Sequence, residues 1–109
     1  MRTLRFIVED QIIKQDPNCD FNDLVPGTKG YLQAEFVFSP EWNGFVKVAT
    51  FCSNMGKEYP PQVLKDGKTC TIPAEALKRR TFKVGVIGKK NAVNLTTNKV
   101  AVSQNGGRE

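Results

Sequence analysis

The 109-residue chain has the length of a single domain with one hydrophobic core, and its 39% hydrophobic and 25% charged residues exclude a largely disordered protein. The net charge of +5 is uneven: residues 1–55 hold five basic and seven acidic residues, whereas residues 56–109 hold eleven basic and four acidic ones. A basic half of this kind attracts nucleic acid or an acidic protein surface, and it also fits a plain solvated face.

Alternating apolar and polar residues predict the strands of the first half. In the first strand Leu4, Phe6 and Val8 share one face, and residues 11–14 continue it after a break at residues 9–10. Residues 15–28 are rich in Asp, Asn, Pro and Gly and indicate a loop. Residues 29–38 form the clearest strand, a turn follows at residues 39–44, and residues 45–52 form the next strand.

The second half continues the same pattern. Two prolines within residues 57–65 favour an edge strand or a loop, and Asp66-Gly67 predicts a hairpin turn between residues 62–64 and 69–72. Residues 73–78 are the one helical candidate. Strands are expected at residues 81–87, 92–95 and 98–103, with a turn at residues 88–91.

Seven to nine short strands with regularly spaced turns predict an all-β fold, a β-sandwich or a small barrel. One face of the clearest strand is apolar and the other polar, which is typical of antiparallel sheets. The chain does not alternate strands with helices, so a parallel sheet is not expected. We expect a single domain over residues 1–103 and a flexible tail over residues 104–109.

The sequence offers little for catalysis or metal binding. Histidine is absent, and Cys19, Cys52 and Cys70 form no close pair, so the usual zinc sites and histidine-based catalysis are excluded. The acidic stretch at residues 16–23 opens like a calcium loop, but Phe21 and Gly27 replace the required glycine and glutamate. We therefore expect no enzyme activity, no metal and no cofactor. We expect reduced cysteines in or near the core, and the sequence leaves a single disulfide as the alternative.

The chain has no long apolar segment that resembles a signal peptide or a membrane helix, so we expect a soluble protein made in a reducing cytoplasm. The basic residues of the second half enclose only one aromatic residue, Phe82, and its alternation places it in the core. Because nucleic-acid binding usually adds exposed aromatic rings, direct binding of nucleic acid is not expected.

Four residues are interface candidates. Trp42 lies at a turn, where a tryptophan either caps the core or anchors an interface. Tyr59 precedes two prolines, and this segment either offers a sheet edge to a partner strand or blocks that edge. Lys89 and Lys90 form the basic part of the predicted turn at residues 88–91.

Several segments of residues 36–102 together form a recognisable pattern. The segments are Phe38-Ser39-Pro40-Glu41-Trp42-Asn43-Gly44, Lys47-x-Ala49-x-Phe51, Leu64-x-Asp66-Gly67, Cys70-x-Ile72-Pro73-x-Glu75-x-Leu77, Phe82-x-Val84-x-Val86-x-Gly88 and Thr96-Thr97-Asn98. They resemble a family of small phage and prophage structural proteins from Gram-positive hosts, and the pattern is similar to the N-terminal domain of phage baseplate upper proteins.

The resemblance implies an immunoglobulin-like β-sandwich that attaches a receptor-binding apparatus to a phage tail. It brings no catalytic residue with it. It therefore predicts a virion protein of the tail, baseplate or head that binds other virion proteins or further copies of itself. The alternative hypothesis is a small phage-encoded inhibitor of a host defence nuclease, similar to an anti-CRISPR protein, whose basic half would cover an acidic surface of the nuclease.

Overall fold

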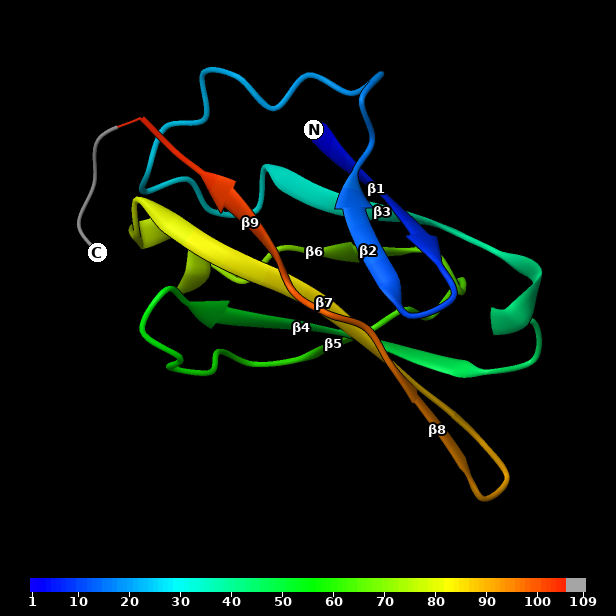
Figure 1. The fold of residues 1–109 in the computed structure, drawn as a ribbon. Helices are drawn as coiled ribbons and strands as arrows, with labels where there is room; N and C mark the ends of the chain where they lie inside the picture. Colours follow the sequence, from blue (N-terminus) through cyan, green and yellow to red (C-terminus); the bar gives the residue numbers. More distant parts are fainter. Residues whose placement is uncertain (106–109) are drawn as a thin grey trace.

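The computed structural model describes residues 1–105, which form two β-sheets packed face to face (Figure 1). Two short 3-10 turns, η1 (Pro40–Trp42) and η2 (Ala76–Lys78), connect strands at the periphery. The predicted all-β sandwich is confirmed, whereas an immunoglobulin-like topology stays a prediction. In the part of the chain described, no helix is long and apolar enough to cross a membrane.

Sheet A has four strands in the order β2-β1-β3-β6. In β1 and β3 buried inward positions alternate with more exposed outward positions, as the sequence pattern predicts. Most of the outward residues are polar, and Ile7 and Val37 are the exceptions. The strands are β1 (Arg2–Glu9), β2 (Ile12–Gln15), β3 (Leu32–Phe38) and β6 (Thr69–Thr71).

Sheet B has the order β5-β4-β7-β8, and β9 also pairs with β7. The two strands β8 and β9 lie end to end along one side of β7, which is the longest strand of the described residues. The strands are β4 (Val46–Ser53), β5 (Gln62–Val63), β7 (Thr81–Lys90), β8 (Val93–Thr96) and β9 (Val100–Ser103).

One strand pair departs from the antiparallel pattern expected from the sequence. β1 and β3 pair in parallel over their full length, with Phe6 opposite Phe36. Residues 11–14 do not continue the first strand, because the chain reverses at Asp10, which has a positive φ of 53°, and β2 pairs back onto β1. The long segment after β2 then returns the chain to the start of β1, where Arg2 N donates to Tyr31 O at 2.9 Å.

The turn at Asp66-Gly67 does not form the predicted hairpin. β5 belongs to sheet B and β6 to sheet A, so this turn carries the chain from one sheet to the other. Leu64 is buried in the core at the crossing point. The Asp66 carboxylate accepts hydrogen bonds from the backbone N–H groups of Lys68 and Thr69 at 2.9 and 2.7 Å, and these bonds fix the turn after the crossing.

The end of β7 and the C-terminal segment also differ from the expectations. β7 continues through the predicted turn at residues 88–91 and reverses only at Asn91, which has a positive φ of 55°. Gln104 is buried, and its side-chain amide donates to Leu77 O and Arg79 O, so the domain extends past residue 103. Residues 106–109 of the predicted tail lie outside the described residues.

A continuous row of aromatic rings runs through the core between the sheets. Neighbouring ring centroids are 5.2 to 6.0 Å apart, a spacing at which aromatic pairs attract each other beyond simple burial. Removing one of the fully buried rings of the row, Phe6, Phe36 or Trp42, typically costs about 3–5 kcal/mol. The row consists of Phe21, Phe6, Phe36, Phe38, Trp42 and Phe45.

The two sheets are joined along one side by the segment between β8 and β9. Asn98 N donates to Gln11 O at 3.1 Å, and Asn98 Oδ1 accepts from Ile13 N at 2.7 Å. Both acceptor and donor lie on the β2 hairpin of sheet A, so Asn98 closes the sandwich at this side. Gly85 permits the crossing, because a Cβ there would lie 3.3 Å from Asn98 O.

Candidate interaction surfaces

Trp42, the first interface candidate, is a core residue. Its side chain is fully buried, and Nε1 donates to Asp10 O at 2.7 Å. Its six-membered ring packs against the Cα of Gly88 on β7. Of the two roles open from the sequence, the structure shows the core cap, so Trp42 offers no surface to a partner in this conformation.

Tyr59 is also mostly buried, with 8% of its surface exposed. Its backbone N donates to Phe51 O at 2.9 Å, and this hydrogen bond holds the segment around Tyr59 along the edge of β4. The hydroxyl is buried and has no hydrogen-bond partner among the described residues. Pro60 and Pro61 follow directly and remove two N–H donors from this edge, so the segment is poorly suited to strand addition.

Lys89 and Lys90 are exposed at the end of β7, and they point to opposite sides of sheet B. Lys90 lies on the inner side, where its Nζ is 5.8 Å from the centroid of the Phe45 ring. Lys89 lies on the outer side, opposite Val46 of β4. Their adjacency in the sequence suggests a single basic site. The two lysines do not form one, because they lie on opposite sides of the sheet.

The outer side of sheet B carries exposed aliphatic side chains in neighbouring positions. Val63, Val48 and Ile87 lie side by side on β5, β4 and β7. Val63 is 53% and Ile87 40% exposed. Val46, the next residue of β4 on the same side as Val48, is 64% exposed. We call this surface, defined by Val46, Val48, Val63 and Ile87, the β4–β7 face.

A shallow depression of about 330 Å³ indents the β4–β7 face. Its walls are mainly apolar and include Val48, Pro61 and Ile87, with Glu58 at the rim. Clustered exposed apolar surface on a small protein marks an interaction site more often than isolated apolar residues do. The sequence gives a signal of this face, since the outward positions of residues 45–52 are themselves mostly valine and threonine.

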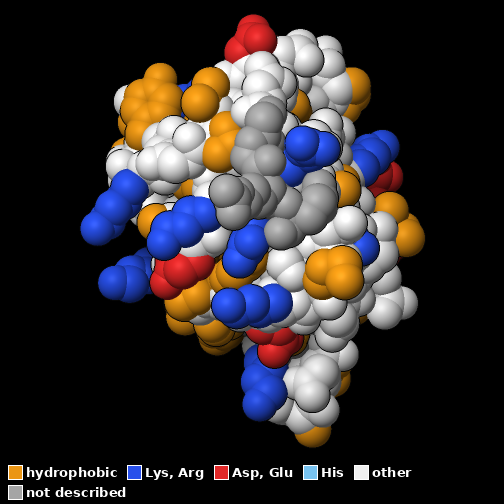
Figure 2. Space-filling view, turned by 90° about the vertical axis from the view of Figure 1, so that its left-hand side faces the viewer, with side chains coloured by type: hydrophobic (Ala, Val, Ile, Leu, Met, Phe, Trp, Pro, Cys, Tyr) orange, Lys and Arg blue, Asp and Glu red, His pale blue; other side chains and the backbone are white. Residues whose placement is uncertain are grey.

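A second surface lies at the end of the sandwich where β7 begins. A surface cleft of about 590 Å³ is lined there by Lys57, Lys78 and Arg79, together with Glu58, Tyr59, Pro60 and Glu75. Figure 2 views the molecule from this end and shows several Lys and Arg side chains with few acidic ones among them. Of the four interface candidates, the structure brings only Tyr59 to this cleft.

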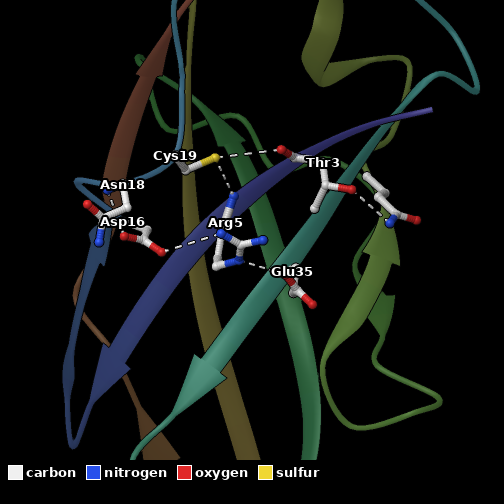
Figure 3. A network of polar contacts seen from close by, with 7 residues as sticks. Thr3, Arg5, Asp16, Asn18, Cys19 and Glu35 are labelled. Carbon is white, nitrogen blue, oxygen red and sulfur yellow. Dashed lines mark hydrogen bonds and ion pairs between the residues drawn. The ribbon is translucent and has the colours of Figure 1, made fainter.

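The outer side of sheet A carries a polar network around Arg5 (Figure 3). Arg5 Nε donates to Glu35 Oε1 at 2.8 Å, and Arg5 also forms an ion pair with Asp16 at 3.7 Å. The hydrogen bond and the charge of Glu35 raise the pKa of Arg5 above its ordinary value. Cys19 Sγ accepts from Arg5 N at 3.3 Å, so the thiol caps the edge of β1 beyond the end of β2.

Within residues 1–105 no group of three or more His, Cys, Asp or Glu side chains is placed to hold a metal ion. All three cysteines are free thiols. Burial, reinforced by the negative charge of Asp66, raises the pKa of Cys70 to about 12. This thiol is therefore protonated at neutral pH, the form that is a poor nucleophile.

The chain was compared with protein families, curated proteins and solved structures. No match was found in any of these three comparisons. The two surfaces described above, the β4–β7 face and the basic cleft, are thus interpreted from their own chemistry.

Proposed function

We propose that this protein acts by binding other proteins, as a structural component of a phage particle. The observation that carries the proposal is the β4–β7 face, on which Val63, Val48 and Ile87 form a cross-strand row and Val46 follows on the same side of β4. A soluble domain gains stability by burying such side chains against a partner. The resemblance to baseplate upper proteins supplies the kind of assembly, and the two-sheet sandwich is compatible with it.

The architecture supports a binding role in a further way. The exposed side chains of the β4–β7 face stand on two long paired strands, β4 and β7, whose backbones are fixed by eight consecutive residue pairs. A rigid sheet presents side chains without a large ordering cost on association. Such a surface suits permanent contacts between the subunits of a particle.

The experiment that tests the virion role is mass spectrometry of particles purified from a phage or prophage that carries the gene. Recovery of the chain at a constant ratio to known coat or tail proteins through a density gradient supports the role. Its loss from particles after gradient purification, while it remains in the lysate, contradicts it. A non-virion phage protein of similar size in the same lysate controls for carry-over.

One observation favours the second candidate function, inhibition of a host defence nuclease. In the basic cleft three basic residues outnumber two acidic ones, Glu58 and Glu75, and a surface with a net positive charge is complementary to acidic protein surfaces. Pull-down from host lysate, followed by a cleavage assay with the recovered nuclease, distinguishes this function. A Lys57→Glu, Lys78→Glu variant would lose inhibition, whereas Lys14→Glu on the remote β2 hairpin would retain it.

A further inference from the structure

We propose that the β4–β7 face binds an acidic protein segment that inserts one apolar side chain into the depression beside Val48, Pro61 and Ile87. The acidic residues that flank this side chain then face the lysines around the depression. The inference rests on the proposed protein-binding function and specifies the chemistry of the partner. Apolar contact supplies the affinity, and charge selects the partner and its orientation.

The apolar part of the argument comes from the strand register. Val48 lies directly opposite Val63 on one side and Ile87 on the other, so the three side chains form one row across sheet B. The depression opens beside this row, between β4 and the segment held by the Tyr59 N to Phe51 O hydrogen bond. An opening of about 330 Å³ accommodates a single large aliphatic or aromatic side chain.

The charged part comes from the same strands. Lys83 and Lys89 are separated by an even number of residues on β7, so both stand on the outer side with Ile87. Lys99, in the segment between β8 and β9, reaches the same side. Its Nζ lies 3.6 Å from the thiol of Cys52, and Cys52 is the residue of β4 directly opposite Lys83. Three lysines thus lie along the face from one end of β7 to the other.

Acidic side chains are scarce around these lysines. Residues 76–105, which include β7, β8 and β9, contain seven basic and no acidic residues. On β4 the outward positions opposite β7 are Val46, Val48, Thr50 and Cys52, and Glu58 at the rim is the one acidic residue that lines the depression. The face therefore keeps a positive potential that favours an acidic partner.

The residues of the face favour a protein over a nucleic acid. Single-stranded nucleic acids stack their bases on exposed aromatic rings. The two aromatic residues that line the depression, Phe51 and Tyr59, are 1% and 8% exposed, and the exposed residues of the row are aliphatic. An aliphatic row beside lysines matches an acidic protein segment with an apolar anchor better than a phosphate backbone.

Side-chain contact is also favoured over addition of a partner strand. β5, the edge strand next to β4, is only two residues long and follows Pro60 and Pro61. A short edge preceded by prolines offers few free backbone donors to another strand. The partner would therefore lie across the face rather than extend the sheet.

The test uses the whole chain, labelled with ¹⁵N, and three synthetic probes. The first probe is a twelve-residue peptide with a central Leu-Phe pair flanked by Asp and Glu; the second replaces each acidic residue with Lys; the third is a twelve-nucleotide single-stranded DNA. We expect the acidic peptide to shift the amide signals of β4, β7 and residues 58–63. Shifts centred on another surface, or equal binding of the basic peptide, would overturn the inference.

Matched variants test the two parts of the face separately. A Lys83→Glu, Lys89→Glu variant should weaken binding of the acidic peptide by about tenfold or more, and Ile87→Asn should weaken it by a similar factor. Lys14→Glu, on an exposed position of sheet A, is the charge control and should bind as the wild type does. Retained affinity in both face variants, or tighter binding of the DNA probe at the same amides, would refute the proposal.

Particle assembly separates this inference from the proposed virion role. If the chain is found in purified particles, but the Ile87→Asn and lysine variants are incorporated at wild-type levels, the virion role stands and the assigned face is wrong. If the chain is absent from particles, but the acidic peptide maps to β4 and β7 and the variants weaken it, the face stands and the virion role is wrong. Circular dichroism of each variant confirms that it remains folded.

Discussion

Trp42 lies so close to Gly88 that a Cβ at position 88 would come within 2.7 Å of Cζ3 of the indole ring. The backbone of Gly88 is not in the left-handed region, so space rather than φ requires glycine there. The indole is in turn fixed by its hydrogen bond to Asp10 O, which ties η1 to the β1–β2 turn. This contact therefore locks the position of a core residue against the C-terminal part of a long strand.

We predict that Gly88→Ala destabilises the protein by about 1–3 kcal/mol, because the added methyl group overpacks a site with no free volume. Chemical denaturation followed by circular dichroism measures the change. Lys89→Ala, at the adjacent exposed position, is the control and should change stability by less than about 0.5 kcal/mol.

A double variant tests the cause of this effect. In a Trp42→Phe background the smaller ring leaves room at position 88, so Gly88→Ala should cost clearly less than in the wild type. An equal cost in both backgrounds would show that the indole ring is not what excludes a side chain there.

Thr97 illustrates a different kind of constraint. Its Oγ1 accepts a hydrogen bond from Val86 N at 2.9 Å. Val86 lies in the part of β7 between the residues paired with β8 and those paired with β9, so neither strand supplies a partner there. Thr97→Val removes this acceptor without changing the size of the side chain. It should cost about 1–3 kcal/mol, because a buried N–H is left unsatisfied.

The neighbouring threonine provides the matched control for this prediction. Thr96 is exposed, so Thr96→Val should leave the free energy of unfolding within about 0.5 kcal/mol of the wild type. Hydrogen exchange of the Val86 amide gives a second readout, since its protection should fall only in the Thr97 variant. Similar stability of the two variants would contradict the assigned role of Thr97.

The strands could be predicted from the sequence because alternation records directly which residues face the core. Phe82, Val84 and Val86 follow the expected pattern, as do Leu4, Phe6 and Val8. Pairing partners could not be predicted in the same way. Asp66-Gly67 has the composition of a hairpin turn, but the burial of Leu64 sends the flanking strands to different sheets, and this tertiary effect leaves no local signal.

The candidate surface was only partly predictable for a related reason. The sequence marks Lys89 as an interface candidate, yet Val46, which lies opposite it, and Val63 of the same face come from segments far apart in the sequence. The sequence allows Trp42 either to cap the core or to anchor an interface, and only the fold decides, because η1 turns its side chain back onto Gly88. A residue's position along the chain does not reveal such contacts.

The raised pKa of Cys70 leads to a prediction about its reactivity. A change from the ordinary value of 9.0 to about 12 lowers the thiolate fraction at pH 8 by about a thousandfold. We expect iodoacetamide to modify Cys70 at least about a hundredfold more slowly in the folded protein than in guanidinium chloride, since transient opening provides a slower alternative route. Peptide mapping by mass spectrometry over a time course measures both rates, and comparable rates would contradict the burial of this thiol.

Asp66 gives a prediction about acid stability. The Thr69 hydroxyl and the N–H groups of Lys68 and Thr69 donate to its carboxylate and lower its pKa from 3.8 to about 2. Because the pKa is lower in the folded than in the unfolded chain, the carboxylate stabilises the fold above about pH 4, and this contribution is lost as the pH falls toward 2. The difference in unfolding free energy between the wild type and Asp66→Asn should therefore be constant near neutrality and shrink between pH 4 and pH 2.

Thr69→Val removes the largest cause of the lowered pKa, the hydroxyl hydrogen bond, and should raise the pKa of Asp66, measured by NMR titration of its side-chain carboxyl. A wild-type value near 3.8 would show that the turn between the two sheets is not held by this carboxylate.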